Sequence, residues 1–259
     1  MPRGSLQADR RQGKLAKMLS RGQSISISSQ ADRFGVHPMT VRRDLDALES
    51  EGLLVRCYGG AIPAQRIAFE FAFGRRRRRH HVAKRRIGFA ASKMIDSRRT
   101  VILDTGTTTL EIARGLSKAG TSCTVITSSL VIAGELWASE PVELMLLGGR
   151  VRRNSPDLVG PGVELMLEKL AADVAFLGAD GIDPKRGCFT IDVEAARVAE
   201  RMAASARRVI VVADSSKLGS AGPVRYLQIK EMDELITDKG ARPPAVASLR
   251  RQGVKVTIV

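Results

Sequence analysis

The chain has 259 residues, 44% of them hydrophobic, and a formal net charge of +15 at pH 7. This length accommodates one large or two ordinary domains with a buried core. No apolar run approaches the roughly 18 residues of a membrane span, and the basic start lacks the apolar core of a signal peptide, so we expect a cytoplasmic protein without a membrane partner. Three widely spaced cysteines and three histidines indicate neither a disulfide framework nor a zinc site, and we expect no metal and no cofactor.

The positive charge is concentrated at the front of the chain. Residues 1–60 hold 10 Lys and Arg against 6 Asp and Glu, residues 61–100 hold 12 against 2, and residues 101–259 hold 20 against 19. Such segregation is typical of a phosphate-binding front end joined to a neutral module. It points to double-stranded DNA as a partner.

Two short helices are expected before residue 37. The first has an apolar side around Leu15 and ends near Gly22. The second covers residues 28–34, with Ser28 as its N-cap. Residues 35–37 then form the three-residue turn that is typical of a helix-turn-helix.

The helix after this turn is the predicted DNA reader. Pro38 suits its first turn, and Val41, Leu45 and Leu48 line one side. Two adjacent arginines on the outer side could enter a major groove, where Arg bridges guanine O6 and N7 or clamps phosphates. Two arginines alone would favour an ordinary helical hairpin with a solvent-exposed basic face. The rest of the chain favours a DNA-binding helix instead. The predicted DNA contacts of the two helices are Ser28, Ser29, Gln30, Met39, Thr40, Arg42 and Arg43.

A hairpin and a basic segment complete the front end. Gly52 ends the reading helix as a C-cap would, and residues 53–62 read as a strand, a glycine turn and a possible return strand, the shape of a wing. Arg56 and Tyr58 would meet the DNA backbone there, although packing of Tyr58 against the helices is an equal alternative.

The predicted domains are residues 1–62, a basic linker at residues 63–86, and residues 87–259. The five arginines at residues 75–79 should raise affinity for any DNA by counterion release, without reading sequence. The phenylalanines just before them could instead dock the linker onto a neighbouring subunit.

The remainder alternates apolar bursts with helical patterns, which predicts a Rossmann-like α/β domain with a mostly parallel sheet. The expected strands lie at residues 101–104, 123–127, 142–147, 173–177, 209–213, 235–237 and 254–259. The expected helices lie at residues 108–116, 130–137, 163–170 and 194–206.

Polar and glycine-rich segments follow five of these strands, and open α/β sheets bind ligands at the carboxyl ends of their strands. Each segment alone is a weak signal, because turns favour these residues. In the first, residues 104–109, a glycine permits a tight turn, and three threonines bring hydroxyl and N–H groups to a helix N-terminus. The segment matches neither a Walker loop nor GxGxxG, so a small phosphorylated molecule is the expected ligand. Simple helix capping by Thr108 is the alternative.

Charged residues complete the predicted effector site. Arg152 and Lys217 could supply positive charge, and Asp104, Asp180 and Glu194 could accept hydrogen bonds from sugar hydroxyls. The full predicted set is Asp104, Gly106, Thr107, Thr108, Thr109, Ser128, Gly148, Gly149, Arg152, Asp180, Glu194 and Lys217.

Several motifs are similar to those of one protein family. They are Thr40-Val-Arg-Arg-Asp-Leu45, Arg56-Cys-Tyr-Gly-Gly-Ala61, Asp104-Thr-Gly-Thr-Thr-Thr109, Gly148-Gly-Arg-Val-Arg152, Gly178-Ala-Asp-Gly-Ile-Asp183 and Asp214-Ser-Ser-Lys-Leu-Gly219. In this order they resemble the DeoR family of bacterial transcriptional regulators, which join a winged helix-turn-helix to a sensor domain similar in fold to ribose-5-phosphate isomerase. The resemblance implies a regulator, usually a repressor, of sugar-catabolism genes that leaves its operator when a phosphorylated sugar occupies the sensor.

The chain departs from the family pattern at a few positions. His37 stands where Ser usually precedes the reading helix, and Arg98 stands where a glycine is common before the first sensor strand. A typical Lys is replaced by Val198, with Arg197 and Arg201 nearby, so ligand choice can differ.

Two rival functions stay open at this point. An active sugar-phosphate isomerase with a DNA-binding arm would need a carboxylate base and groups that stabilise an enediolate, and Glu194, Asp180, Asp183 and Lys217 are of the required types. Nonspecific nucleoid binding is the other. For the regulator we expect a homo-oligomer, dimer or tetramer, in which ligand shifts the arrangement of subunits and the DNA arms lose their spacing.

Overall fold

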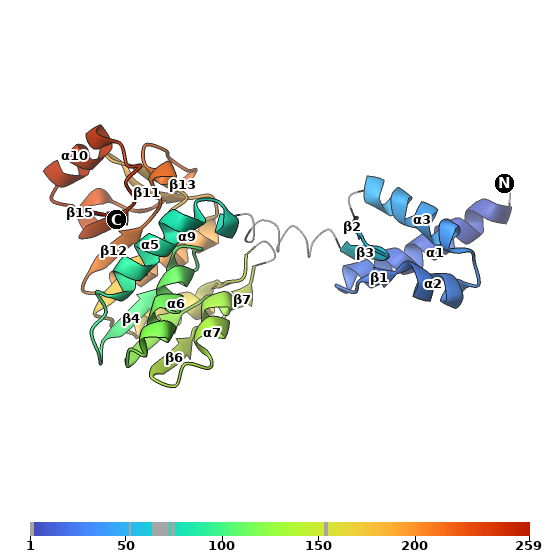
Figure 1. Cartoon of the computed structure of the whole chain (residues 1–259), viewed down its shortest axis with the longest axis horizontal. Helices are drawn as coiled ribbons and strands as arrows, with labels where there is room; N and C mark the ends of the chain where they lie inside the picture. Colours follow the sequence, from blue (N-terminus) through green and yellow to red (C-terminus); the bar gives the residue numbers. More distant parts are fainter. Residues whose placement is uncertain (1–2, 52, 64–72, 74–75, 153–154) are drawn as a thin grey trace. The chain divides into compact units, whose positions relative to one another are not determined.

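A computed structural model of the chain describes residues 3–51, 53–63, 73, 76–152 and 155–259. The chain divides into two compact units, Met1–Arg75 and Arg76–Val259 (Figure 1). In the part of the chain so described, no helix combines the length and the hydrophobicity that a bilayer crossing requires. The predicted fold class, a winged helix-turn-helix joined to a mostly parallel α/β domain, is confirmed.

The first unit is a three-helix domain with a wing. Its elements are α1 (Arg3–Ser20), β1 (Ile25–Ser26), α2 (Ile27–Phe34), α3 (Pro38–Ser50), β2 (Leu54–Cys57) and β3 (Gly60–Pro63). The three strands form an antiparallel sheet in the order β1-β3-β2. The predicted stripe of Val41, Leu45 and Leu48 is buried and packs with Leu15 and Leu54 into one core. This core fixes α3 with its opposite side in solvent.

The caps of the helix-turn-helix correct one expectation. Ser26, and not Ser28, is the N-cap of α2, and its hydroxyl accepts a hydrogen bond from the Ser29 N–H at 3.5 Å. Gly35 then ends α2 in the left-handed region at φ 62°, which glycine adopts without steric cost. His37 does cap α3, with Nδ1 accepting from the Met39 N–H at 3.2 Å. The predicted cap residue Gly52 lies outside the described residues.

The second unit is built on a seven-stranded parallel sheet in the order β15-β14-β12-β9-β4-β5-β6. Its strands are β4 (Thr100–Leu103), β5 (Cys123–Thr127), β6 (Val142–Leu146), β9 (Val174–Leu177), β12 (Val209–Val212), β14 (Glu234–Thr237) and β15 (Lys255–Ile258). All seven predicted strands are confirmed. Most of their side chains are buried, as expected for strands covered on both faces.

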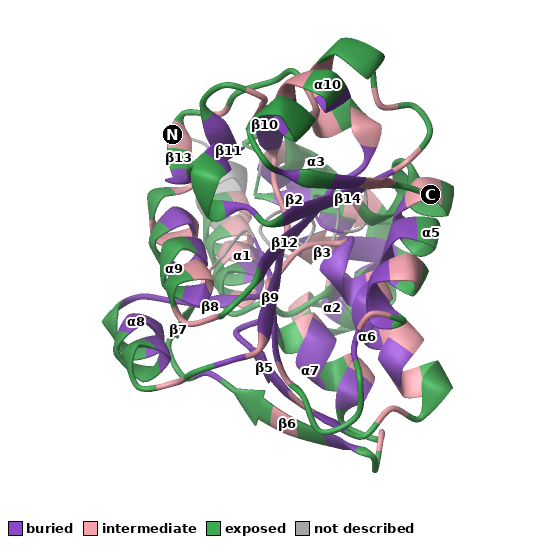
Figure 2. Ribbon diagram, turned by 90° about the vertical axis from the view of Figure 1, so that its left-hand side faces the viewer, coloured by how far each residue is buried: buried purple, intermediate pink, exposed green. Residues whose placement is uncertain are grey.

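Helices cover the two faces of this sheet, and their buried sides turn toward it (Figure 2). One layer contains α5 (His81–Ser92), α6 (Thr109–Ala119) and α7 (Leu130–Leu136), and the other contains α8 (Pro161–Glu168) and α9 (Val193–Ala204). The last helix, α10 (Pro243–Arg251), packs against β15. The sequence did not predict α5, α10 or the small antiparallel sheets. These are β7 (Arg150–Val151) with β8 (Leu158–Val159), and β10 (Gly181–Asp183), β11 (Gly187–Thr190) and β13 (Val224–Leu227).

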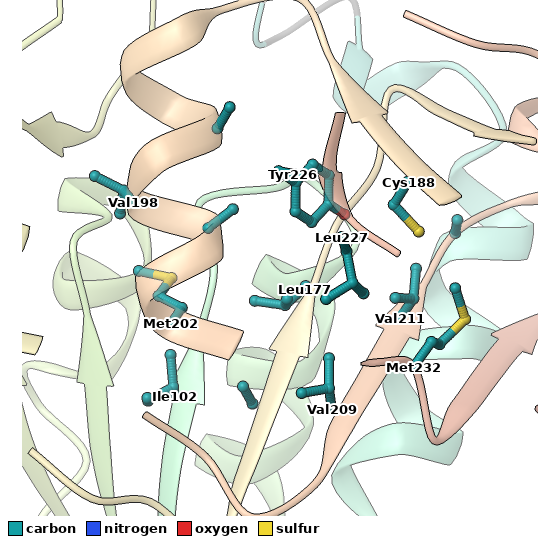
Figure 3. Close-up of a cluster of buried hydrophobic side chains, with 14 of the residues drawn as sticks. Ile102, Leu177, Cys188, Val198, Met202, Val209, Val211, Tyr226, Leu227 and Met232 are labelled. Atoms are coloured by element: carbon teal, nitrogen blue, oxygen red, sulfur yellow. The ribbon is translucent and has the colours of Figure 1, made fainter. Parts of the chain in front are cut away.

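The main core joins the parallel sheet to α9 and to the small β10-β11-β13 sheet. Val198 and Met202 of α9 belong to the same buried cluster as Leu177 and Val209, and Figure 3 shows the helix beside the strands that carry these two residues. Tyr226 of β13 reaches the same cluster, which connects β13 to the end of β9. This packing positions the loops at the carboxyl ends of the strands.

The second half of the expected linker belongs to the second unit. Residues 81–86 are the first turns of α5, and Lys84 and Ile87 are buried there. Ile87 and Ala91 follow Lys84 at i+3 and i+7, so the three share one side of the helix, which packs against α6. The exposed charged residues on the other side of α5 made this segment resemble a linker in the sequence, so the buried side was not predicted.

Arg98 adopts a left-handed backbone conformation with φ 66°, at the position where the resemblance implies a glycine. An L side chain in this region costs roughly 1 kcal/mol or more, and glycine avoids this cost but loses more backbone entropy on folding. We therefore expect Arg98→Gly to raise the free energy of unfolding by about 0.5–1 kcal/mol in urea denaturation. Arg99→Gly is the matched control and should lower stability, because Arg99 has an ordinary φ and pairs with Asp173 at 3.1 Å. Equal effects of the two changes would contradict the strain argument.

Candidate nucleic-acid interface and anion site

The outer side of α3 presents the predicted reading residues. Arg42 and Arg43 are exposed, and neither has an ion-pair partner among the residues that the structure describes. Met39 is also exposed, and Thr40 is half-buried. Two unpaired guanidiniums on a helix that follows a tight turn can enter a major groove without first breaking internal contacts.

A residue that the sequence did not single out fixes this helix. Asp44 is buried on the inner side of α3, and its carboxylate accepts hydrogen bonds from Arg11 Nε at 2.5 Å and Nη2 at 3.0 Å. Gln12 Nε2 donates to the same carboxylate at 3.2 Å. The hydrogen bond to Asp44 raises the pKa of the Arg11 guanidinium. In the sequence, Asp44 lies three residues after Val41, on the apolar side of the helix. A charged residue at this position could have indicated a buried carboxylate that needs a cationic partner.

One predicted contact of α2 is corrected. Ser28 and Ser29 are exposed at the start of the helix, but Gln30 is buried, and its Oε1 has no hydrogen-bond partner among the described residues. A side chain enclosed in the domain core cannot reach DNA, so Gln30 leaves the set of candidate contacts.

The two wing residues behave differently. Tyr58 is fully exposed at the tip of the hairpin, so the alternative that it packs against the helices is wrong. Arg56 instead turns toward α3, where Nε lies 3.8 Å from Asp46 Oδ1. Its backbone N–H also donates to Glu49 Oε1 at 3.4 Å. Arg56 therefore supports the wing against α3.

In the second unit, the predicted effector loops meet at the topological switch point of the sheet. The strand order reverses between β4 and β9, which are neighbours although four strands separate them in sequence. The Gly178 N–H, after β9, donates to Asp104 Oδ2, after β4, at 2.9 Å. Open α/β sheets bind ligands at this point.

Buried groups hold the two loops. Burial raises the pKa of Asp104, and the Asp157 carboxylate contributes in the same direction, although hydrogen bonds from Gly178 and Thr105 oppose the shift. The Tyr226 hydroxyl donates to the carbonyl of Gly178, and burial raises its pKa well above the ordinary value. These contacts fix the backbone that surrounds the site.

The Arg152 guanidinium is paired with two carboxylates. Its Nε donates to Asp157 Oδ1 at 2.9 Å, and its Nη1 lies 3.3 Å from Asp192 Oδ1. The Thr105 hydroxyl donates to Asp157 Oδ2 at 3.0 Å, so Asp157 connects the β4 loop to the β7-β8 hairpin. The expectation that Arg152 offers a free charge to a ligand is therefore wrong, because its guanidinium organises the loops. Asp157 and Asp192 were missed by sequence reasoning.

Glu194 is also paired, and its Oε2 accepts a hydrogen bond from Nη2 of Arg150 in β7. Asp192, two residues earlier, is the N-cap of α9, and its Oδ1 accepts from the Ala195 N–H at 2.9 Å. Burial alone would raise the pKa of Asp192, but this hydrogen bond and the Arg152 guanidinium lower it. The start of α9 thus closes one side of the site with charge pairs.

The threonine loop divides into two roles. The Thr109 hydroxyl is fully buried and donates to the carbonyls of Asp104 at 2.6 Å and Gly106 at 2.9 Å, so its predicted ligand contact is corrected to a loop-closing role. Thr108 is buried and occupies the N-cap position of α6, as the helix-cap alternative expected, although its hydroxyl makes no capping hydrogen bond. Thr107 and Gly106 are partly exposed at the end of β4.

The neighbouring loops contain less accessible candidates. Ser128 is fully buried, and its Oγ has no partner among the described residues, so it can contact a ligand only after the loop moves. A Cβ at Gly149 would lie 2.6 Å from Val163 Cγ2 and 2.8 Å from the Val159 carbonyl oxygen. Gly149 therefore serves close packing, whereas a Cβ at Gly148 would meet nothing closer than Met166 at 4.0 Å.

A group of cations lies at the carboxyl end of β12. The buried Lys84 Nζ lies 4.0 Å from Asp214 Oδ2 and donates to the Arg76 carbonyl oxygen at 2.5 Å. Burial lowers the pKa of Lys84; Asp214 opposes this, and the nearby Lys217, Arg76 and Arg79 lower the pKa further. Positive charge thus exceeds negative charge at this point, which favours an anion.

The basic segment touches the predicted site directly. Arg76 Nη1 lies 4.0 Å from Asp180 Oδ1, and the Thr190 hydroxyl donates to Asp180 Oδ2 at 3.0 Å. Residues 77–79 are exposed, and Arg75 lies outside the described residues. A separate depression of about 550 Å³ between α9 and β13, lined in part by Arg207 and Arg225, contains none of the predicted residues.

Family models match both units. The model described as the DeoR C terminal sensor domain matches residues 79–239, and that of the DeoR-like helix-turn-helix domain matches residues 11–66.

The chain belongs to the DeoR family of transcriptional regulators.

Two relatives illustrate the breadth of this DeoR-family similarity. The HTH-type transcriptional regulator GlpR of Haloferax volcanii is 35% identical over 246 residues, which are 95% of this chain and 96% of the relative. The HTH-type transcriptional repressor GlcR of Bacillus subtilis is 34% identical over 220 residues, 85% of this chain and 84% of the relative. The resemblance that the motifs suggested is confirmed.

Solved structures are more distant from this DeoR-family chain. Ribose 5-phosphate isomerase A of Methanocaldococcus jannaschii is 20% identical, covers 52% of this chain and 53% of its own, and has a TM-score of 0.38. A similarity of this size carries no statement about activity.

Three residues of α9 stand at or near the position where the DeoR-family pattern has a Lys, and none of them offers a free positive charge to the site. Val198 is buried in the core, so the side chain at this position does not reach the site. Arg197 pairs with Glu164 at 3.1 Å and Arg201 with Glu168 at 3.2 Å, both on α8. Neither arginine replaces the missing Lys as a free cation.

Proposed function

We propose that this protein is a repressor of carbohydrate-catabolism genes that releases its operator when a phosphorylated sugar intermediate binds the second unit. The observation that carries the proposal is the group of cations at the carboxyl end of β12, beside the β4/β9 switch point, where the buried Lys84 lies 4.0 Å from Asp214 and Lys217 and Arg76 are nearby. A phosphate is an anion that needs positive charge, and sugar hydroxyls donate to carboxylates such as Asp180. The chain would work in the cytoplasm, on double-stranded operator DNA, as a homo-oligomer.

The proposed DNA contacts are Ser28, Ser29, Met39, Thr40, Arg42, Arg43 and Tyr58. The proposed effector contacts are Lys84, Asp104, Gly106, Thr107, Thr108, Gly148, Asp180, Glu194 and Lys217. Arg152, Asp157 and Thr109 would hold the loops around the ligand.

The contact of Arg76 with Asp180 supports a route from ligand to DNA. A ligand that takes Asp180 as a hydrogen-bond acceptor competes with Arg76 for the same carboxylate. Loss of that contact would free the segment that leads to the first unit, and ligand would thereby shift the population of arrangements that fit an operator.

The rival isomerase reading has weaker support. Two of its candidate bases are engaged: Glu194 pairs with Arg150, and Asp183 Oδ1 accepts N–H groups of the turn between β10 and β11. A general base needs a free lone pair within reach of the substrate proton. We therefore propose binding without turnover.

The decisive experiment is a ligand screen on the purified chain. Phosphorylated pentoses and hexoses are compared with the same sugars without phosphate, and the melting temperature is measured. A ligand at 100 times its Kd stabilises the native state by about 2.7 kcal/mol, which raises Tm by roughly 5–10 °C for a chain of this size. The active ligand should also release operator DNA in a fluorescence-anisotropy titration, and no isomer should accumulate by NMR. Stabilisation by an unphosphorylated sugar alone, or turnover, would overturn the proposal.

A further inference from the structure

A row of positive charges runs along the solvent-facing side of α1. Arg10, Lys14 and Lys17 follow one another at spacings of four and three residues, and Arg21 stands four residues further on, in the turn that ends the helix. At 3.6 residues per turn, these spacings keep the four side chains within about 60° of arc. All four are exposed, and none has an ion-pair partner among the described residues. Asp9, the single acidic residue of α1, lies roughly 100° around the helix from Arg10.

A fifth cation joins this row from α2. Arg33 is exposed, and its Nη1 lies 3.9 Å from Met18 Sδ of α1. Lys14 Nζ lies 5.9 Å from the centre of the Phe34 ring, which places the C-terminal end of α2 beside the middle of the row. Arg33 also has no ion-pair partner in the part of the first unit that the structure describes. We call the group formed by these cations the α1 row: Arg10, Lys14, Lys17, Arg21 and Arg33.

The α1 row and the reading side of α3 face in opposite directions. The inner sides of the two helices pack together, because Leu15 and Leu45 share one core and Arg11 pairs with Asp44. On both helices the exposed cations lie roughly on the far side from these contacts, and on α3 that side carries Arg43. The core of the first unit therefore separates the α1 row from a duplex that α3 reads.

The composition of the α1 row favours a nucleic-acid duplex over a protein as its partner. Protein interfaces centre on apolar or aromatic anchors and are poor in Lys, whereas α1 exposes no large hydrophobic residue among its described side chains. Single strands bind through exposed aromatic rings on which bases stack, but Phe34, the ring beside the row, is half-buried with Lys14 over it. A DNA duplex carries one negative charge per about 1.7 Å of its axis. The distance from Arg10 to Arg21 is about 16 Å at 1.5 Å per residue, so the row is long enough to meet several phosphates.

We propose that the α1 row binds the phosphate backbone of a second DNA duplex, so that one DNA-binding unit bridges the duplex read by α3 and another segment of DNA. The second duplex is bound through its phosphates, which carry no sequence information, so its sequence does not matter. Its binding falls steeply with salt, because each phosphate contact releases about 0.9 counterions. The inference rests on the proposed reading of DNA by α3, and it is independent of the effector.

Capture of one duplex by another tests the proposal on the full-length protein. A biotinylated operator, selected from random duplexes, is held on streptavidin beads and saturated with protein, and a fluorescent duplex of unrelated sequence is then added at several salt concentrations. The wild type should retain the second duplex at low salt. Lys14→Gln combined with Lys17→Gln should weaken this capture by about tenfold or more and reduce its salt slope by about 2, because two phosphate contacts are lost. Operator affinity, measured separately by anisotropy, should stay within about twofold of the wild type, because the α1 row faces away from the duplex that α3 reads.

Lys185→Gln combined with Lys239→Gln is the matched control, because it removes the same charge from two exposed lysines of the second unit. Capture should be unchanged. Equal loss in the two double variants would assign capture to overall charge, and normal capture by Lys14→Gln/Lys17→Gln would assign it to the reading helices of neighbouring copies; either result overturns the proposal. A wild type that binds the operator but captures no second duplex overturns it too, and adhesion of that protein to poly-glutamate beads would assign the α1 row to an acidic protein. Failure to bind the first duplex would defeat both the reading role of α3 and this inference.

Discussion

Replacement of Arg43 by alanine should weaken operator binding by about 5- to 150-fold while affinity for random DNA changes little. Arg43 is exposed on the outer side of α3, and a bidentate contact with a base is worth about 1–3 kcal/mol, which corresponds to this factor. The side chain has no ion-pair partner among the described residues, so its removal should leave the domain folded. The loss would thus measure base reading.

The measurement is a fluorescence-anisotropy titration at fixed salt, with an operator selected from a library of random duplexes and a scrambled duplex of the same length. Arg77→Ala is the matched control. Arg77 is exposed in the basic segment, and its loss should weaken both duplexes by a similar factor, because phosphate contacts carry no sequence information. If Arg43→Ala also weakens both duplexes equally, then Arg43 clamps phosphate, and its assignment as a base reader is wrong.

Replacement of Lys84 by methionine should abolish release of the operator by the phosphorylated effector and weaken effector binding by more than about 100-fold, on the scale of a lost charge-assisted contact in a desolvated site. Lys84 is buried beside Asp214, and Lys217, Arg76 and Arg79 lie near enough to lower its pKa. A phosphate there would neutralise several like charges at once. The operator affinity of the variant without effector should match that of the wild type, because Lys84 lies in the second unit.

Two readouts separate a binding role from a structural one. Arg85→Met changes the next, exposed residue of α5 and should leave effector release intact. Because burial lowers the pKa of Lys84, its ammonium becomes neutral at a lower pH than that of an exposed lysine, and effector affinity should fall as pH rises toward that pKa. The Lys84→Met variant should lack this component of the pH dependence. Normal effector release by Lys84→Met would exclude Lys84 from the site.

Should the methionine variant prove unstable, Lys217→Gln offers the same test at a half-buried position. It removes one charge from the cation group, so effector affinity should fall in the same direction while the melting temperature without ligand stays near that of the wild type.

The sequence by itself determined the elements whose signal is local. Continuous apolar bursts predicted all seven strands of the parallel sheet, because strands buried on both faces need apolar side chains at nearly every position. The i, i+4, i+7 spacing of Val41, Leu45 and Leu48 predicted both α3 and its inner side. The segregated charge and the motifs at the strand ends predicted a DNA-binding unit and a sensor unit.

Only the tertiary structure decided which charges are free. Arg152 resembled a ligand-binding cation in the sequence, but Asp157 and Asp192 neutralise it. In the sequence, Lys84 was one of several charges in a predicted linker. In the structure it lies on the buried side of α5 with Ile87 and Ala91, next to Asp214. Gln30 resembled a DNA contact, but the packing of the first unit encloses it. Charge and polarity are properties of single residues, whereas their pairing and burial depend on segments brought together from far apart in the chain, and for this reason local patterns could not assign them.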